Sequence, residues 1–249
     1  VNTPILEQTE LFIRSTGVTS DIVNKEIYSF NDRNEQSLSL RPEGTAGVVR
    51  SVIQKKLDSV EHKLWYQGPM FRYERPQKGR FRQFNQAGVE LLGFEEGPSD
   101  LEIISIVCDI FIELELEDSV LKINHLGDKD TKERFLSELL KYLKTYKGVL
   151  NDSDKEKLDK NPLRLLDSKD INLKDFLDKG PKIKDFLSSE QLNLLDNIQS
   201  IFGKYVEIEL DSSLVRGLDY YTGLVFEAVS SNLGAQDSFL GGGRYDELS

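Results

Sequence analysis

The residues best suited to chemistry lie in one stretch, residues 71–90, which reads FRYERPQKGRFRQFNQAGVE. Side chains alternate between the two faces of a β-strand, so every second residue from position 84 onward shares one face. These residues are Phe84, Gln86, Gly88 and Glu90. A ring, an amide, a gap and a carboxylate are poor material for an apolar core, and together they suit the floor of a site for a small polar ligand. The other face, at positions 87, 89 and 91, carries Ala, Val and Leu side chains, which are ordinary core residues.

The same stretch is basic, although the chain as a whole is acidic, with a formal net charge of -11. Within its first part, residues 71–82, one acid, Glu74, is accompanied by a series of cationic side chains. These are Arg72, Arg75, Lys78, Arg80 and Arg82. An acidic protein binds polyanions only through local basic patches, so this arm predicts a local phosphate site.

A β-hairpin is expected to carry these side chains. Residues 71–74 and 82–91 are strand-like in composition, and the Pro-Gln-Lys-Gly sequence at 76–79 between them is typical of a turn. Residues 63–67 are predicted to form another strand that leads into the hairpin.

A second turn, residues 41–45, reads RPEGT. Leu38 and Leu40 before it alternate with serines, which predicts a short strand, and the apolar residues after it recur at helical spacing. A strand, a tight turn and a helix N-terminus in this order expose backbone N–H groups above the turn. Glu43 and Thr45 can therefore cap the helix or contact a ligand, and the pattern leaves both roles open.

The chain divides by composition into three parts. Residues 1–127 are predicted to form the first part of a core domain. Residues 128–203 are rich in Lys and Asp, and their short amphipathic segments, interrupted at Asn161-Pro162 and Gly180-Pro181, predict a helical insertion. Residues 204–249 are predicted to complete the core.

The last part returns to strand character at residues 205–210 and 214–229. Gly217 and Gly223 within the second run mark bulges or the close approach of a ligand. Residues 241–246, GGGRYD, are predicted to be a glycine turn. Neither their spacing nor their context fits a dinucleotide-binding fingerprint.

Composition limits the class of protein. A chain of 249 residues with 38% hydrophobic and 30% charged residues is ordinary for a soluble globular protein with a substantial core. The longest apolar runs fall far short of the roughly 20 residues of a membrane span, and no secretory signal is visible. The single Cys108 cannot form an internal disulfide, so a core thiol in a reducing cytoplasm is expected. The chain begins at Val1 and ends soon after a glycine cluster, which suggests a fragment.

Taken together, these stretches resemble the histidyl-tRNA synthetases, class II aminoacyl-tRNA synthetases, in their bacterial form. Residues 71–90 resemble the motif 2 of that family, with its arginine and glutamate at Arg72 and Glu74. Residues 214–223 (LVRGLDYYTG) and 241–246 (GGGRYD) resemble its two histidine-specific signatures.

Residues 40–45 (LRPEGT) and 161–169 (NPLRLLDSK) are similar to further segments of the family, and the resemblance spans essentially the whole chain. It implies an α+β fold, in which an antiparallel β-sheet is flanked by helices and interrupted by the helical insertion. Residues 3–5 resemble the end of motif 1, whose helix builds the dimer interface of the family. The motif 3 and the anticodon-binding domain of the family are expected after residue 249.

The resemblance implies a two-step reaction. The carboxylate of L-histidine attacks the α-phosphate of ATP and expels pyrophosphate, and the histidyl group then passes to the 3' end of tRNA(His). Such displacement needs alignment and positive charge more than covalent help, and the planar fork of arginine suits both. By resemblance, Arg72 and Arg216 are catalytic and hold the α-phosphate from two sides. Glu74 and Phe84 would bind adenine, Arg80 the distal phosphates, and Mg²⁺ would bridge these phosphates without an identified protein ligand.

Histidine recognition must satisfy an ammonium group and both imidazole nitrogens, because a buried unpaired polar group costs about 1–3 kcal/mol. The resemblance assigns some side chains to the ammonium and carboxylate and others, above all Glu90 and Tyr221, to the imidazole. The expected histidine-binding residues are Glu43, Gly44, Thr45, Arg72, Gln86, Glu90, Arg216, Tyr220, Tyr221 and Tyr245. The family further implies a cytoplasmic homodimer that contacts tRNA through the basic loop at residues 75–82 and through the insertion.

Two other functions compete with this interpretation. A synthetase-like regulatory subunit of histidine biosynthesis would bind histidine without charging tRNA. Such relatives tend to lose parts of motif 2 and the signature around Arg216, all of which are present here. A plain RNA-binding module would explain the basic hairpin, but it leaves the polar floor at Gln86 and Glu90 unexplained.

Overall fold

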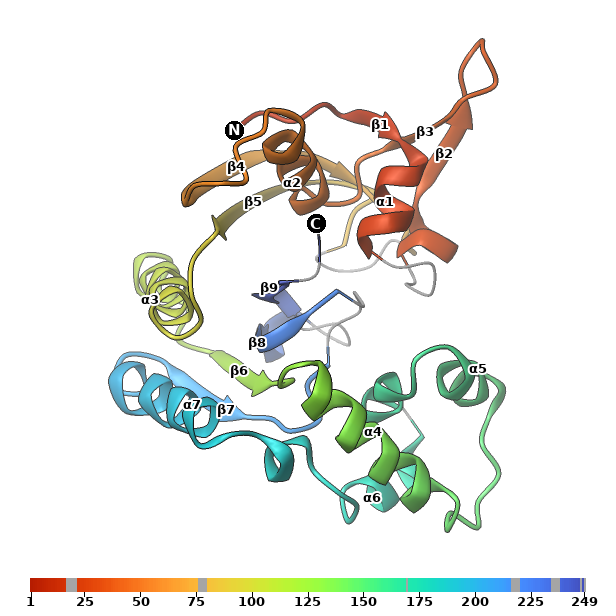
Figure 1. Cartoon of the computed structure of the whole chain (residues 1–249), viewed down its shortest axis with the longest axis vertical. Coiled ribbons are helices and arrows are strands. Elements are labelled where there is room, and N and C mark those ends of the chain that lie inside the picture. The colour runs from red at the N-terminus through yellow and green to blue at the C-terminus, as the bar shows by residue number, and fades with distance from the viewer. Residues whose placement is uncertain are drawn as a thin grey trace. The chain divides into compact units, whose positions relative to one another are not determined.

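The structure is a computed structural model of the chain, and it describes residues 1–16, 22–75, 80–168, 170–215, 220–233, 238–246 and 248. The chain forms two compact units, whose elements are labelled in Figure 1. Val1–Ser99 make up nearly all of unit 1, and residues 100–215 together with Tyr221–Tyr245 make up unit 2. Both units combine helices with sheets, which confirms the predicted α+β class.

Unit 1 contains a three-stranded antiparallel sheet. Its central strand is β3 (Ser37–Leu40), which pairs on one side with β1 (Leu6–Gln8) and on the other with β2 (Tyr28–Asn31). Helix α1 (Thr9–Thr16) follows β1 directly, and a π-helical turn at Ile22–Glu26 precedes β2. The strand predicted from the alternation of leucines and serines is therefore confirmed as β3.

A long two-stranded ribbon forms the second sheet of unit 1. Strands β4 (His62–Phe71) and β5 (Gln83–Leu92) pair antiparallel over their whole length. The predicted strand at residues 82–91 is thus confirmed as β5, and the predicted turn at 76–79 lies outside the described residues.

The partner of β5 differs from the prediction, because residues 63–67 and 71–74 were expected to be separate strands. One strand, β4, instead continues through Gly68 and Pro69. A contact from outside the ribbon explains this continuity. The carbonyl oxygen of Pro69 accepts a hydrogen bond from Arg41 Nε at 2.9 Å, and Gly68 leaves room for the same guanidinium group.

Helix α2 (Thr45–Gln54) packs on the ribbon, as Figure 1 shows. Val48 of α2 forms a buried cluster with Tyr66 and Met70 of β4, and Phe84 of β5 packs against this cluster. In the β4–β5 register Tyr66 is opposite Gly88 and Met70 is opposite Phe84. The face of the ribbon that was singled out for its polar residues is therefore the face that meets α2.

Unit 2 is built on a four-stranded sheet with the order β7-β6-β8-β9. Strand β6 (Ser119–His125) runs antiparallel to β8 (Thr222–Ser230) and parallel to β7 (Glu207–Leu210). Strand β9 (Ser238–Arg244) lies antiparallel to β8 at the edge, and the β8–β9 register shifts between Thr222 and Val225. Gly223 lies in this shift with a φ of 50°, so the predicted bulge is confirmed there, whereas Gly217 lies outside the described residues.

Strand β9 corrects the prediction of a glycine turn at residues 241–246. Residues 241–244 pair with β8 as part of strand β9, with the register shift between Gly243 and Arg244. The glycines are needed for space, because a Cβ at Gly242 would collide with the ring of Phe226, and a Cβ at Gly243 would collide with the carbonyl oxygen of Leu224. Glycine here reflects close packing between strands.

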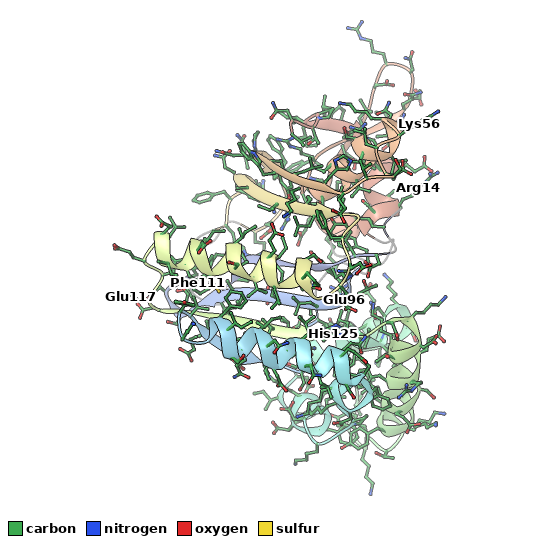
Figure 2. All side chains as sticks on the ribbon, turned by 60° about the vertical axis from the view of Figure 1, so that its left-hand side comes forward. Arg14, Lys56, Glu96, Phe111, Glu117 and His125 are labelled. Carbon is green, nitrogen blue, oxygen red and sulfur yellow. The ribbon has the colours of Figure 1, made fainter. Side chains whose placement is uncertain are left out.

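Two helices complete the core of unit 2. Residues of α3 (Pro98–Glu113) and α7 (Ser189–Phe202) share one hydrophobic cluster with β6 and β8, and Phe111 of α3, labelled in Figure 2, belongs to it. Cys108 lies in the same cluster, and burial raises the pKa of its thiol to about 11. The thiol therefore stays protonated at neutral pH, which agrees with the predicted inert core cysteine. Across the described residues, no helix is long and apolar enough to cross a membrane.

Helices follow one another through the segment that the sequence predicts to be helical. They are α4 (Lys129–Leu143), α5 (Asp152–Lys160), a 3₁₀ turn at Pro162–Asp167, α6 (Ile171–Leu177), a 3₁₀ turn at Ile183–Phe186, and α7. Because α7 packs into the core of unit 2 with β6, the segment contributes to the same compact unit as that sheet. The division into a core and a separate insertion at residues 128–203 stays a prediction.

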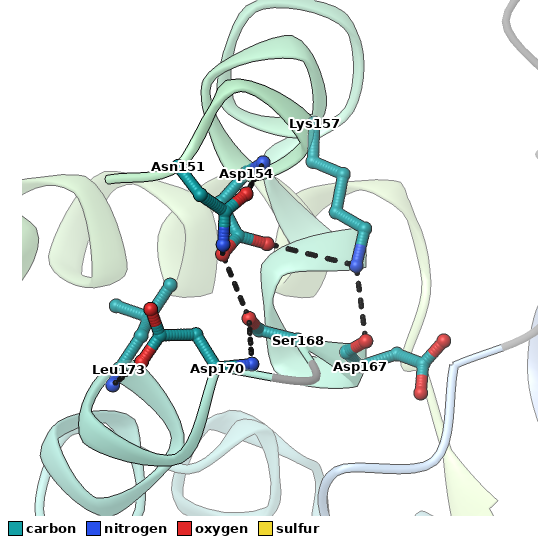
Figure 3. Close-up of polar contacts among 7 residues, drawn as sticks. All are labelled: Asn151, Asp154, Lys157, Asp167, Ser168, Asp170 and Leu173. Carbon is teal, nitrogen blue, oxygen red and sulfur yellow. Dashed lines mark hydrogen bonds and ion pairs between the residues drawn. The ribbon is translucent and has the colours of Figure 1, made fainter.

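A buried carboxylate joins these helices, as Figure 3 shows. Asp154 of α5 accepts hydrogen bonds from Asn151 Nδ2 at 2.7 Å and from Ser168 Oγ at 2.9 Å. Lys157 Nζ lies 3.8 Å from the carboxylate and donates to the carbonyl oxygen of Asp167 at 3.0 Å. Asp154 therefore ties the start of α5 to the segment that follows the first 3₁₀ turn.

Replacing this carboxylate should destabilise unit 2. Asp154→Ala leaves the buried hydroxyl of Ser168 without its acceptor, so the free energy of unfolding in urea should fall by roughly 1–3 kcal/mol. The matched control is Asp159→Ala, an exposed aspartate on the same helix, which should change it by less than about 0.5 kcal/mol. Equal losses in both variants would contradict a structural role for Asp154.

Candidate functional site

Glu43 caps helix α2. Its two carboxylate oxygens accept hydrogen bonds from the backbone N–H groups of Thr45, at 2.6 Å, and Ala46, at 2.9 Å. Of the two roles left open by the sequence, the structure shows the capping role, which places a negative charge at the positive end of the helix. Glu43 is only 4% exposed, and burial raises the pKa of its carboxyl group although the N–H groups of Ala46 and Thr45 and the charge of Arg72 act to lower it.

Thr45 connects this helix end to strand β5. Its Oγ1 donates a hydrogen bond to Glu90 Oε1 at 2.6 Å, and Glu90 is buried. Gln86 lies two residues before Gly88 on the same face, and its Oε1 is buried with no hydrogen-bond partner among the described residues. Three hydrogen-bonding residues that the sequence assigns to one ligand thus lie on neighbouring positions of unit 1.

Arg72 reaches the same turn from just beyond the end of β4. Its Nε donates to the carbonyl oxygen of Pro42 at 2.8 Å, and its guanidinium carbon lies 5.2 Å from the centroid of the Phe84 ring. The backbone N–H of Arg72 donates to the carbonyl oxygen of Arg82 at 3.0 Å, which extends the pairing of the ribbon. The Pro42 carbonyl and the Phe84 ring therefore set the direction of the Arg72 guanidinium.

The basic arm is organised around its one acid. Glu74 Oε2 accepts a hydrogen bond from Arg80 Nη1 at 2.5 Å, and Glu74 Oε1 lies 4.0 Å from Arg72 Nη1. Arg82 Nε donates to the backbone carbonyl of Glu74 at 3.3 Å, and its guanidinium stacks over the ring of Tyr73. The cationic side chains around Glu74 are therefore held in place before any anion binds.

One ring occupies the space beside two glycines of the site. A Cβ at Gly44 or at Gly88 would come closer to the ring of Tyr66 than 3.0 Å, a separation that real Cβ atoms essentially never show. The gap expected at Gly88 is thus filled by Tyr66, which sequence reasoning did not single out. The available signal was its place on the strand before the hairpin, opposite the glycine.

Arg41 is a second residue that sequence reasoning missed. Its guanidinium is buried and, besides the bond to Pro69, donates from Nη1 to the carbonyl oxygen of Thr3 at 2.7 Å and to Thr3 Oγ1 at 3.0 Å. Its backbone N–H donates to the carbonyl oxygen of Ile5 at 2.9 Å. Arg41 therefore joins the turn before α2 to β4 and to the N-terminal segment.

Two of the predicted tyrosines lie in unit 2. Tyr221 and Tyr245 flank the last residue pair of β8 and β9, Thr222 with Arg244, so both lie at one end of that sheet. Tyr221 is buried, and its backbone carbonyl accepts a hydrogen bond from Lys132 Nζ. This hydrogen bond ties the backbone at Tyr221 to helix α4.

The remaining predicted residues fall elsewhere. Tyr220 is half-buried and groups with unit 1. Arg216 lies outside the described residues, as does Lys78 of the basic arm. The structure thus brings together the predicted residues of motif 2 and of the turn before α2, and a single site that also includes Arg216 and the unit 2 tyrosines stays a prediction.

Solved structures match this fold. The crystal structure of apo histidyl-tRNA synthetase from S. aureus matches the whole chain with a TM-score of 0.74 and 34% sequence identity, and the match covers 58% of that protein. A structure described as an ATP phosphoribosyltransferase regulatory subunit/histidyl-tRNA synthetase from Bacillus halodurans C matches with a TM-score of 0.64 and 25% identity, over 67% of its chain. The fold is therefore the α+β catalytic fold of the class II aminoacyl-tRNA synthetases.

Sequence comparisons narrow this class to one family. Histidine–tRNA ligase from Francisella philomiragia is 49% identical over 252 residues, and that from Synechococcus sp. (strain JA-3-3Ab) is 48% identical over 251 residues. A family model described as Histidyl-tRNA synthetase matches residues 1–249. The chain belongs to the histidyl-tRNA synthetase family. It spans 59% and 60% of the length of these two relatives.

The raised pKa of Glu43 predicts a pH-dependent stability. A carboxyl group whose pKa is higher in the folded than in the unfolded chain stabilises the fold below its unfolded pKa, and this contribution is lost as the pH rises through the folded pKa. The stability advantage of the wild type over Glu43→Gln should therefore shrink as the pH rises from about 4 toward neutrality. Urea unfolding at a series of pH values measures this difference.

The control is Glu61→Gln, which replaces an exposed glutamate. Its difference from the wild type should stay nearly constant over the same pH range. A difference for Glu43→Gln that is constant, or that grows with pH, would contradict the raised pKa.

Proposed function

We propose that the complete protein is a histidine–tRNA ligase, which activates L-histidine with ATP to histidyl-adenylate and transfers the histidyl group to the 3' end of tRNA(His). The observation that carries this proposal is the group of buried hydrogen-bond acceptors between α2 and β5: Glu43, Gln86 and Glu90. Acceptors in this number favour a ligand rich in donors, and an ammonium group together with an imidazole is such a ligand. A donor that reaches Gln86 Oε1 would also remove the cost of a buried unpaired acceptor, about 1–3 kcal/mol.

In this proposal the amino acid lies across the end of α2. Glu43, Thr45 and Gln86 lie around the ammonium group, and Glu90 and Tyr221 hold the two imidazole nitrogens. Gly44, Tyr220 and Tyr245 line the same site. An apolar isostere of histidine would leave the carboxylate of Glu90 without its ligand partner, so it would be rejected strongly.

ATP would bind at the other end of the ribbon. Arg72 and Arg216 would hold the α-phosphate from two sides, and Arg72 suits this role because its fork stays charged and binds two oxygens at once. Phe84 would stack on adenine, and Glu74 would accept from the amino group of the base. Because Arg80 is paired with Glu74 in the structure, this pair has to open before Arg80 reaches the distal phosphates.

Mg²⁺ would enter with ATP and be held mainly by phosphate oxygens. In the described part of the chain, no group of three or more His, Cys, Asp or Glu residues is placed to hold a metal ion. The complete protein would act in the cytoplasm as a homodimer. Its tRNA contacts, through residues 75–82 and the helices of 128–203, would weaken with salt.

A second candidate function is favoured by the match to the Bacillus halodurans structure, whose description includes a regulatory subunit. A regulatory relative would bind histidine and would not form the adenylate. The phosphate-directed arginines Arg72, Arg80 and Arg216 are all present in this chain, which favours the ligase.

Pyrophosphate exchange tests the proposed function. Arg72→Lys keeps one positive charge but loses the fork that binds two oxygens, so histidine-dependent ATP–pyrophosphate exchange by the complete protein should fall by about 10²–10³. The matched control, Arg82→Lys, lies directly opposite Arg72 on the ribbon and should keep most of the exchange. No histidine-dependent exchange by the wild type would refute the ligase, and near-normal exchange by Arg72→Lys would remove Arg72 from catalysis.

A further inference from the structure

Tyr66 lies at the centre of the proposed amino-acid site. Its ring fills the Cβ space of Gly44, whose chain neighbours are Glu43 and Thr45. The same ring fills the Cβ space of Gly88. On either side of Gly88 along that face of β5 are Gln86 and Glu90, so four polar residues of the proposed site adjoin a glycine that rests on this ring.

The ring is held firmly in this place. Tyr66 is 6% exposed, and it packs against Val48 and Met70, which are both fully buried. Phe84 and Leu64 pack against the same cluster. Interiors packed in this way deform little, so the ring cannot retreat when a larger group is placed against it.

Two consequences follow for the site. First, both the start of α2 and strand β5 rest on one rigid ring, and this ring sets the spacing at which Thr45 Oγ1 meets Glu90 Oε1, 2.6 Å. Second, a ligand held between Gln86 and Glu90 lies against the ring of Tyr66, because the ring occupies the position where a side chain at Gly88 would begin.

We propose that Tyr66 is a positioning and specificity-determining residue, whose ring sets the depth of the amino-acid site and so limits it to a compact polar side chain such as imidazole. This inference rests on the proposed function of the same site. It assigns the selectivity for size to Tyr66, whereas the selectivity for hydrogen-bonding groups comes from Gln86 and Glu90.

The test is a set of variants of the complete protein: Gly88→Ala, Tyr66→Leu, the two combined, and Tyr66→Phe. Calorimetry measures the dissociation constants of L-histidine, of a ring-methylated L-histidine and of ATP, and urea unfolding measures the stability of each variant. Gly88→Ala should raise the dissociation constant of L-histidine by roughly tenfold or more, which is the usual effect of one misplaced methyl group in a pocket. ATP affinity should change much less, because Gly88 lies four residues from Phe84 along β5.

The remaining variants separate positioning from simple core filling. Tyr66→Phe keeps the ring and should keep the affinity for L-histidine. Tyr66→Leu should weaken the binding of L-histidine and reduce the difference in affinity between L-histidine and the ring-methylated analogue. In the combined variant the methyl group added at residue 88 meets no ring. The affinity for L-histidine should therefore be higher than in Gly88→Ala alone. The effects of the two substitutions would then not add, which shows that the two residues are coupled.

Several results would overturn the proposal. The ring does not position the amino-acid site if the effects of Gly88→Ala and Tyr66→Leu on L-histidine affinity simply add. The same conclusion follows if either variant lowers the affinities for L-histidine and for ATP equally. If Gly88→Ala does not fold, the comparison of Tyr66→Phe with Tyr66→Leu still decides, because equal histidine affinity and equal selectivity in these two refute the role of the ring. A wild-type protein that binds no L-histidine would refute the proposed function itself, and this inference with it.

Discussion

The contact between the first turn of helix α2 and the β4–β5 ribbon is the interaction on which the site depends. Glu43 caps the helix, Thr45 bonds Glu90 across to β5, and the Tyr66 ring fills the space beside Gly44 and Gly88. No short stretch of chain makes this arrangement alone, because its parts come from one turn and two strands. The carboxylates of Glu43 and Glu90 are buried where these three segments meet.

This contact also explains how acidic side chains are tolerated in the interior. A buried carboxylate costs several kcal/mol unless it is hydrogen-bonded or paired. Glu43 is compensated by two backbone N–H groups and Glu90 by the hydroxyl of Thr45, while Arg72 contributes positive charge nearby. The pKa of Glu43 nevertheless stays raised, so its compensation is incomplete. Under the proposed function, an ammonium group beside Glu43 would favour the ionised form of this carboxyl group.

The basic arm shows the opposite arrangement at the other end of the ribbon. Glu74 holds Arg80 directly and lies near Arg72, while Phe84 and the Pro42 carbonyl orient the Arg72 guanidinium. The Arg72 guanidinium is therefore oriented before any anion binds, whereas Arg80 would first have to leave Glu74. The ribbon thus carries the acceptors of Gln86 and Glu90 along β5 and the guanidinium groups near its Phe71–Gln83 end.

Local patterns were enough to predict strand β5 and the start of helix α2, but they divided β4 into two strands. Alternation along residues 84–90 predicted which side chains share a face, and the RPEGT turn predicted the start of α2. The errors come from contacts between distant residues. Gly241–Gly243 suggested a turn, yet they form a strand because Phe226 and Leu224 leave no room for side chains.

The role of Tyr66 was missed for a similar reason. It depends on glycines that lie 22 residues away on each side in sequence, and no local pattern connects them to the ring. Arg41 was missed because its partners, Thr3 and Pro69, are equally remote. Spacing along the chain can predict a face, but it cannot predict which distant side chain covers that face.

A crystal structure of the complete protein with L-histidine would locate the ligand directly. We expect electron density for the ammonium group within hydrogen-bond distance of Gln86 Oε1, close to Glu43, and for the imidazole against Glu90 and the ring of Tyr66. Density for histidine that lies away from the face shared by Gln86 and Glu90 would refute an amino-acid site between α2 and β5.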